Sequence, residues 1–310
     1  MTDKPKLTPA NEDPWYILMT LHGEHDGGEV DPAKHRGNLT AWNELEYAPR
    51  RTNDSDWLDF GKHWRLERKN WSKLQQEFAI RSEGAEAKLP ANGQPVVLSQ
   101  LRFEKPLVLT DYAFRAHVTF EDCVFEGQVT LDNCYFDAGV TFKDVQFRKG
   151  LSFKKSGCRT AFEATDITTQ DDMTFAGSRF GGASTWKSLT FEPKSGDTSK
   201  RQISFLGARF DDYADFAEVT FDCYTVFQDT TFAQRAMFSR SRFKRGVSFR
   251  SAVFRDYAYF NDAQFTAAPN TKTSCSIPDD HIDPRRSAFF MARSVLEDIR
   301  KEKRDARSTA

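Results

Sequence analysis

The chain has 310 residues, a formal net charge of −1 at pH 7, and 28 Phe residues. The near-zero charge argues against a strongly basic nucleic-acid-binding protein and against a strongly acidic protein that imitates DNA. No apolar run approaches the roughly 20 residues of a membrane-spanning helix. Residues 1–7 carry two lysines, but the apolar core of a signal peptide does not follow them. We therefore expect a cytoplasmic protein.

The sequence shows no motif that carries catalysis or binds a cofactor. Glycine-rich phosphate loops, nucleophile elbows and zinc-protease motifs are absent. The five cysteines form no CxxC pair, so we interpret them as small buried residues in a reducing compartment. His22, His25 and His35 could be imagined as a metal cluster, but they lie beside a glycine-rich loop without a fixed second set of ligands. We predict a non-enzymatic protein with no metal, no cofactor and no catalytic residue.

Residues 1–13 are polar, and we expect them to be disordered. We assign residues 14–90 to a helical N-terminal head. It begins with a short apolar strand or docking segment at 14–23. A first helix follows from Asp31, the expected N-cap, with Pro32 at the first helical position, to about Leu45.

A second helix is predicted from about Ser55 to Ser82. Its large apolar side chains recur at helical spacing and form one face, which comprises Trp57, Phe60, Trp64, Trp71, Leu74 and Phe78. We expect this head to cap the open end of the repeats that follow, since an uncovered end would expose apolar rings and strand edges. An independent ligand-binding role is the alternative.

From Phe103 to Phe265 a large apolar residue, usually Phe, recurs at alternating spacings of five and six residues. The residue two positions before each is small or slim, and the others are mostly polar. A period of 11 is typical of a repeat architecture. We call each five- or six-residue unit that contains one large apolar residue a word. Four such words would close one coil of 22 residues, and coils stacked about 4.8 Å apart would align the rings in columns. The spacing predicts about seven coils.

The repeat is interrupted twice. Phe162 and Ile167 lie two residues off the pattern, so we expect a local bulge or a rearranged coil at about 154–172. Between Phe191 and Phe205 the spacing is 14 instead of six, and residues 192–201 are rich in Gly, Pro, Ser and charge. We predict a protruding loop there, which is either a partner-binding site or a tolerated surface insertion.

Charged residues form an acidic band followed by a basic band. The acidic band comprises Asp211, Asp212, Asp215, Glu218, Asp222 and Asp229. Both bands are either ordinary solvated surface or a polarised docking surface. Combined with the loop, the basic band gives our candidate partner-binding residues: Lys194, Lys200, Arg201, Arg240, Arg242, Lys244, Arg245 and Arg250.

The words Ala208-Arg209-Phe210, Ala214-Asp215-Phe216 and Ala252-Val253-Phe254 resemble those of the pentapeptide-repeat family, in particular a Phe-rich bacterial branch with an 11-residue, five-plus-six repeat. The resemblance covers residues 98–268 and implies a mainly β fold, a right-handed quadrilateral β-helix. Such proteins often have a helical head, which the order of Pro14-Trp15-Tyr16 and Ala41-Trp42-Asn43 also resembles.

After the repeats, residues 280–310 predict a charged C-terminal helix whose apolar side includes Phe289, Phe290 and Leu296. Members of the family that protect gyrase are acidic rods that usually dimerise through a C-terminal helix. Others continue into membrane spans. The present chain could therefore form a homodimer through its C-terminal helix, or be the soluble part of a membrane-associated protein.

Our functional hypothesis is a scaffold for protein–protein interaction that binds another protein and does not bind nucleic acid directly. The first alternative is a DNA-mimicking binder of a topoisomerase such as gyrase. Residues 98–268 contain 22 basic and 22 acidic residues, so the rod is neutral, which counts against mimicry. The second alternative is association with a membrane, which the mixed charges of residues 300–304 would favour only weakly.

Overall fold

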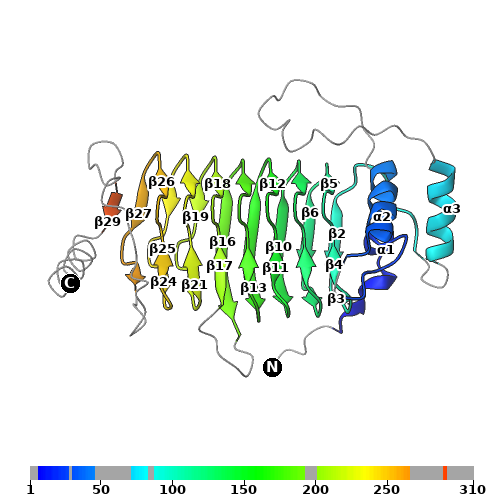
Figure 1. Cartoon of the computed structure of the whole chain (residues 1–310), viewed down its shortest axis with the longest axis horizontal. Helices are drawn as coiled ribbons and strands as arrows, with labels where there is room; N and C mark the ends of the chain where they lie inside the picture. Colours follow the sequence, from blue (N-terminus) through cyan, green and yellow to red (C-terminus); the bar gives the residue numbers. More distant parts are fainter. Residues whose placement is uncertain are drawn as a thin grey trace, which may run out of the picture.

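The computed structural model describes residues 6–27, 30–45, 71–82, 87–192, 201–265 and 289–291. It is a parallel β-solenoid of about seven coils with a helical head against its N-terminal end (Figure 1). Each coil is nearly square and contributes one short strand to each of four faces, which we call A, B, C and D in chain order. Successive coils pair at a shift of 22 residues, as Val118 with Val140 and Val140 with Phe162. The predicted coil length is therefore confirmed.

Faces A and B share three long strands that bend through the corner between them: β10 (Val140–Phe147), β13 (Phe162–Thr169) and β16 (Ser184–Phe191). Face A also contains β2 (Val96–Ser99), β6 (Val118–Glu121), β19 (Ala214–Asp215), β23 (Ala236–Met237) and β27 (Ala258–Phe260). Face B also contains β3 (Leu101–Phe103), β7 (Val124–Phe125), β20 (Thr220–Phe221), β24 (Arg242–Phe243) and β28 (Gln264–Phe265).

The other two faces are each a sheet of seven strands. Face C contains β4 (Leu107–Val108), β8 (Val129–Thr130), β11 (Leu151–Ser152), β14 (Met173–Thr174), β17 (Gln202–Ser204), β21 (Tyr224–Val226) and β25 (Val247–Ser248). Face D contains β5 (Ala113–Phe114), β9 (Tyr135–Phe136), β12 (Gly157–Cys158), β15 (Arg179–Phe180), β18 (Arg209–Phe210), β22 (Thr231–Phe232) and β26 (Val253–Phe254).

Alternate corners turn through a residue in the left-handed region. These residues recur every 11 positions apart from the eight-residue insertion, and their φ values lie between +50° and +67°. They are Gln100, Asp111, Asp122, Asn133, Asp144, Lys155, Asp166, Gly177, Ser188, Gly207, Glu218, Asp229, Arg240, Ser251 and Asp262. Asp and Asn dominate because their short polar side chains tolerate this backbone better than most. Each residue lies in a five-residue word, so the shorter spacing marks the tight corner.

The interior is filled by columns of stacked aromatic rings. Phe205, Phe227 and Phe249 stack at centroid distances of 4.8 and 5.1 Å with nearly parallel planes. Phe216 and Phe238 do the same on the opposite face at 5.2 Å. These spacings match the separation of paired strands, so register and ring stacking reinforce each other.

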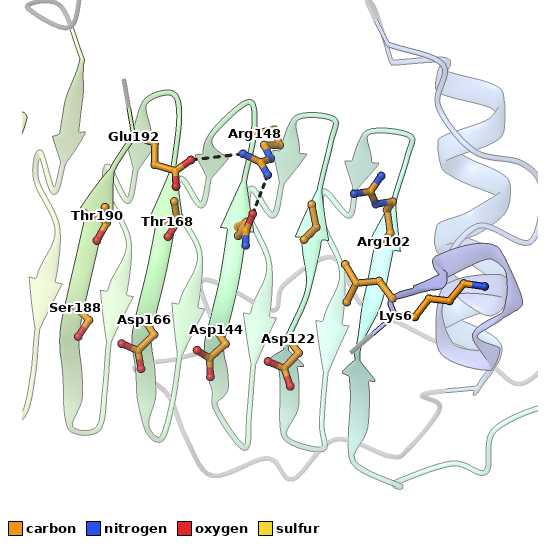
Figure 2. A pocket seen from close by; sticks show the side chains of 13 residues that line it. Lys6, Arg102, Asp122, Asp144, Arg148, Asp166, Thr168, Ser188, Thr190 and Glu192 are labelled. Atoms are coloured by element: carbon orange, nitrogen blue, oxygen red, sulfur yellow. Dashed lines mark hydrogen bonds and ion pairs between the residues drawn. The ribbon is translucent and has the colours of Figure 1, made fainter. Parts of the chain in front are cut away.

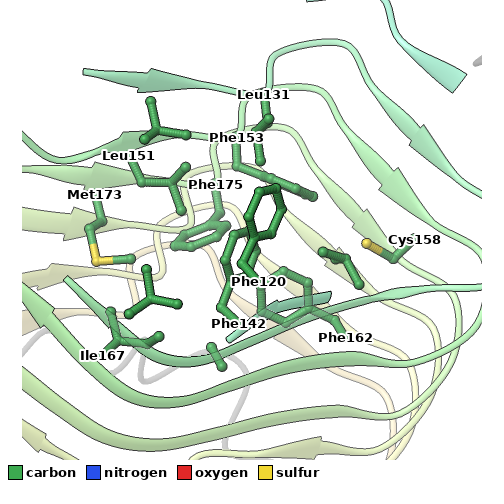
Figure 3. Close-up of a cluster of buried hydrophobic side chains, with 14 of the residues drawn as sticks. Phe120, Leu131, Phe142, Leu151, Phe153, Cys158, Phe162, Ile167, Met173 and Phe175 are labelled. Atoms are coloured by element: carbon green, nitrogen blue, oxygen red, sulfur yellow. The ribbon is translucent and has the colours of Figure 1, made fainter. Parts of the chain in front are cut away.

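The coil at 154–175 keeps its register but exchanges the sizes of its inward residues. Phe162 pairs with Val140 in the small slot, whereas Ala164 pairs with Phe142 in the ring slot. Trp186 in the next coil stacks on Phe162 at 4.6 Å, so the space above Ala164 is filled. Figure 3 shows the ring of Phe162 in the buried core near Phe142. Of the two alternatives predicted for this segment, the backbone bulge is wrong and the rearranged coil is confirmed. Moving a ring two residues along a strand keeps it on the same face of the sheet, so no extra residue is needed.

The head covers the first coil. It consists of α1 (Pro14–Met19), α2 (Pro32–Leu45) and α3 (Trp71–Arg81). The indole Nε1 of Trp42 donates to the carbonyl oxygen of Ala113 at 2.7 Å, and its rings lie 4.9 Å from Phe114. Tyr112 donates its hydroxyl hydrogen to the carbonyl oxygen of Met19 at 3.2 Å. The predicted cap at Asp31 is confirmed, since its carboxylate accepts from the amides of Ala33 and Lys34.

Two predictions for the N-terminal region are corrected. Residues 14–19 form a helix and not a strand, because Asp13 caps the amides of Trp15 and Tyr16 and Pro14 occupies the first turn. Residues 6–13, expected to be disordered, are ordered: β1 (Thr8–Pro9) pairs with Leu101 and Arg102, and η1 (Ala10–Glu12) follows. The unpaired edge of β3 offers the hydrogen bonds that order this segment. Most of the second predicted helix, at 55–70, lies outside the described residues.

The predicted C-terminal helix at 280–310 also lies mostly outside the described residues. Within it, β29 (Phe289–Met291) is a strand that pairs with β27, because the last coil presents an open strand edge. Among the described residues, no helix is long and apolar enough to cross a bilayer.

Candidate functional site: a groove on face B

A groove of about 970 Å³ runs along face B in the N-terminal half of the solenoid. Its floor is one side-chain column from successive coils, made of Arg102, Val124, Gln146, Thr168 and Thr190. Lys6 and Leu7 border it at the end near the head, and Glu192 lies at the other end (Figure 2). The paired sheet beneath fixes the spacing of this column, so the floor of the groove is rigid.

One wall of the groove is a ladder of carboxylates at the corner between faces A and B. Asp122, Asp144 and Asp166 occupy equivalent left-handed positions in three consecutive coils, with Ser188 next (Figure 2). The pKa of Asp144 is raised by partial burial and by the charges of Asp166 and Asp122 above and below it. Like charges at one-coil spacing repel each other, so a cation in the groove would relieve this repulsion.

Glu192 organises the end of the groove at the insertion. Its carboxylate lies 3.5 Å from Arg148 Nη1 and accepts from Gln170 Nε2 at 3.2 Å. Its carbonyl oxygen accepts from Arg201 Nη1 at 2.7 Å. Arg148 also donates to Gln146 Oε1 at 2.9 Å. The two ends of the eight-residue insertion are thereby held together at the mouth of the groove.

The predicted partner-binding residues have different environments. Lys194 and Lys200 lie outside the described residues, and Arg201 anchors the base of the insertion. Arg240 hydrogen-bonds Glu218. Lys244 and Arg245 share Asp222 at 3.4 and 3.5 Å. The register therefore places the basic band against the acidic band of the preceding coil, where exposed pairs partly neutralise each other.

Arg242 and Arg250 are exposed and make no ion pair within the described ranges. Arg242 continues the column of the groove floor, since it pairs with Thr220 and Gln264 in neighbouring coils of face B. Arg250 lies at the corner after face C, away from this column. The structure thus brings Arg201 and Arg242 to the face that carries the groove and leaves Arg250 apart.

The carboxylate ladder was missed by the sequence reasoning, which followed the Phe positions and the two charge bands. A signal was present: Asp122, Asp144 and Asp166 recur every 22 residues, which is one coil. The corner assignment of these residues also needed their left-handed φ values.

The three histidines of the head are spread over different surroundings. The rings of His25 and His35 lie 6.4 Å apart, and Nε2 of His22 lies 3.8 Å from Glu77. Across the described part of the chain, no group of three or more His, Cys, Asp or Glu residues is arranged to hold a metal ion. His25 is instead a buried side chain whose two ring nitrogens lack hydrogen-bond partners.

The fold is a parallel β-solenoid with short strands on four faces and an interior filled by aromatic rings. Residues 205–253 match the family model for pentapeptide repeats, with nine copies. This part of the chain therefore consists of pentapeptide repeats. No curated protein and no solved structure shows significant similarity to it.

Proposed function

We propose that this protein is a non-enzymatic scaffold that holds an extended, basic segment of another protein in the groove of face B. The observation that carries the proposal is the ladder of Asp122, Asp144 and Asp166 along a rigid floor. Four of the five cysteines are described, and all four are free and buried, which is consistent with the cytoplasm as the proposed location.

The chemistry of the groove favours a peptide over a small substrate. Its floor offers hydroxyl and amide groups from Thr168, Thr190 and Gln146, which suit the backbone of an extended chain. The carboxylates recur about every 4.8 Å, so Lys or Arg side chains of one segment could each meet at least one of them. Such electrostatic complementarity supplies specificity and association rate more than raw affinity.

The order of charges along face B also suggests how the bound partner is oriented. One wall of the groove is acidic, the insertion base follows, and Arg242 then extends the column of the floor. A partner that is basic along the groove and acidic beyond the insertion would complement the whole face. In this proposal Arg201 and Arg242 remain partner-binding residues, as the sequence predicted. The carboxylate ladder contributes most to the choice of partner.

The test is affinity capture from a lysate of the source cells, read by mass spectrometry, with three forms of the full chain. The groove variant carries Asp144→Asn and Asp166→Asn. The matched control carries Asp111→Asn and Asp229→Asn at equivalent corners between faces C and D. Because Asn also tolerates left-handed φ values, both variants should keep the fold.

We expect a protein that the unmodified chain and the control capture, and that the groove variant captures about tenfold less. The captured protein should contain a segment rich in Lys or Arg, and a synthetic peptide of that segment should compete. Equal capture by all three forms would exclude the groove as the site. Enrichment of nothing above the bare resin would count against the scaffold itself.

A further inference from the structure

The C-terminal half of face A carries side chains unlike those of its N-terminal half. In the N-terminal coils, most of its outward positions hold small or short polar residues, with Val97, His117 and Glu163 as exceptions; the others are Thr119, Thr141, Thr185, Gly139, Ala161 and Ala183. In the C-terminal coils, the same two columns hold Tyr213, Arg235, Tyr257, Asp215, Met237 and Tyr259. Tyr, Arg and Met are enriched at the buried centres of protein interfaces.

The register places these six side chains in a compact array. The amide of Ala214 donates to the carbonyl oxygen of Arg235 at 2.9 Å, and the amide of Ala236 donates to that of Tyr257 at 2.9 Å. Asp215, Met237 and Tyr259 pair directly in neighbouring strands. The rings of Tyr257 and Tyr259 lie 6.1 Å apart, and Tyr257 is 43% exposed.

The sign of the charge changes sharply between the first two of the three coils that carry this array. Residues 211–234 contain six Asp or Glu residues and no Lys or Arg. Residues 235–255 contain seven Lys or Arg residues and no Asp or Glu. A second rod laid alongside in the opposite direction would place each acidic coil against a basic coil. The surface is therefore complementary in charge to its own antiparallel copy.

On face B these opposite charges are already used within one chain, by Glu218 with Arg240 and by Asp222 with Lys244 and Arg245. On face A, Asp215 and Arg235 form no such ion pair within the described residues. Arg235 is exposed and makes no ion pair within the described residues. The Asp215 carboxylate accepts from the amide of Ala217 at 3.0 Å and is hydrogen-bonded to the Tyr213 side chain, and its two oxygens can accept further hydrogen bonds.

We propose that a second copy of this chain docks antiparallel on the C-terminal half of face A. The two-fold axis lies between the coil of Asp215 and the coil of Arg235, so these coils face each other and the long Arg235 side chain of each copy reaches Asp215 of the other diagonally. Met237 lies next to the axis, and the tyrosines flank it. This surface is separate from the groove, which occupies face B in the other half of the rod.

The array is small, so the dimer should be weak and concentration-dependent, and added salt should loosen it. The test is the monomer–dimer equilibrium of the full chain, measured by sedimentation at low and high salt. Three variants are compared: Arg235→Glu, Asp215→Lys with Arg235→Glu, and Arg250→Glu. The last makes the same charge change in the same coil, but away from face A.

We expect Arg235→Glu to raise the dimer dissociation constant about tenfold or more, because it places like charges opposite each other twice. Asp215→Lys combined with Arg235→Glu should restore dimerisation, since the two exchanged charges again face their opposites across the axis. Arg250→Glu should have no effect. Thermal unfolding of each variant checks that the fold is retained.

A monomer at every concentration, or dimerisation unaffected by Arg235→Glu, would overturn the proposal. So would a double exchange that fails to restore the dimer while its fold is intact. None of these results bears on capture by the groove variant, because the substituted residues differ. The self-association and the scaffold function are therefore tested independently.

Discussion

The solenoid and the head bury their interiors by different means. In the coils, each ring rests on an equivalent ring in the next coil, as Phe238 does on Phe216 and Phe260. In the head, unlike side chains meet once: Trp42 contacts Trp15, Tyr112 and Phe114. The head also buries His25 with both ring nitrogens unpartnered. The coils of the rod repeat one packing arrangement, whereas the head buries a titratable histidine.

The coil at 154–175 refines this comparison. It loses rings from the slots held by Cys158, Ala164 and Thr169, yet its register is continuous on both sides. Phe162 and Ile167 return part of the missing volume from the neighbouring inward slots. The solenoid therefore depends on a filled coil interior more than on a fixed residue at each slot, as expected of a close-packed interior.

The largest expected effect tests this volume rule. Phe238→Ala in a regular coil and Phe162→Ala in the exchanged coil should each lower the free energy of unfolding by about 3–5 kcal/mol, because both rings are fully buried. Chemical denaturation measures the loss. If Phe162→Ala cost under about 1 kcal/mol while Phe238→Ala cost the full amount, the displaced ring would not carry the packing of its coil.

A smaller effect should distinguish the head by its pH dependence. Burial lowers the pKa of His25 from 6.5, and the neighbouring His35 and Lys34 lower it further, against the opposing charges of Asp31 and Asp26. The unfolded chain therefore binds more protons below pH 6.5, and the free energy of unfolding should fall as the pH drops through that value. Denaturation followed by tryptophan fluorescence at a series of pH values measures the slope.

His25→Phe should flatten this slope. His117 provides the control, because its two ring nitrogens lie 2.8 Å from the carbonyl oxygen of Ala138 and 3.0 Å from Thr141 Oγ1 on the solenoid. An unchanged slope in His25→Phe, with a flattened slope in His117→Gln, would assign the response to the rod and reverse the comparison.

The smallest effect concerns the repeated corners. Lys155 has a φ of +52°, where Gly is favoured, so Lys155→Gly should raise the free energy of unfolding by up to about 1 kcal/mol. Gly177→Ala in the next coil, at +67°, should lower it by a similar amount. The difference between their thermal midpoints measures the corner strain. Shifts of the same sign would show that these corners do not set the stability of the rod.

Much of the solenoid could be predicted from the sequence. The alternation of five and six residues gave the coil length, the inward rings and the size of the insertion, because a repeat forces equivalent residues into equivalent slots. For the exchanged coil, a bulge was one of the two predicted alternatives, because Phe162 and Ile167 appear displaced when only the ring positions are counted. The groove was not foreseen, because its wall depends on which corners turn through left-handed residues.

The sequence alone determined the period, the family and the composition of the core, since stacking repeats local information along one axis. Tertiary structure decided which charges meet. It paired Asp222 with Lys244 and Arg245 across coils, brought Lys6 beside the floor of face B, and ordered the segment before Asp13 on the edge of β3. These outcomes depend on the pitch of the coil and on the open edges at its ends, which no single repeat contains.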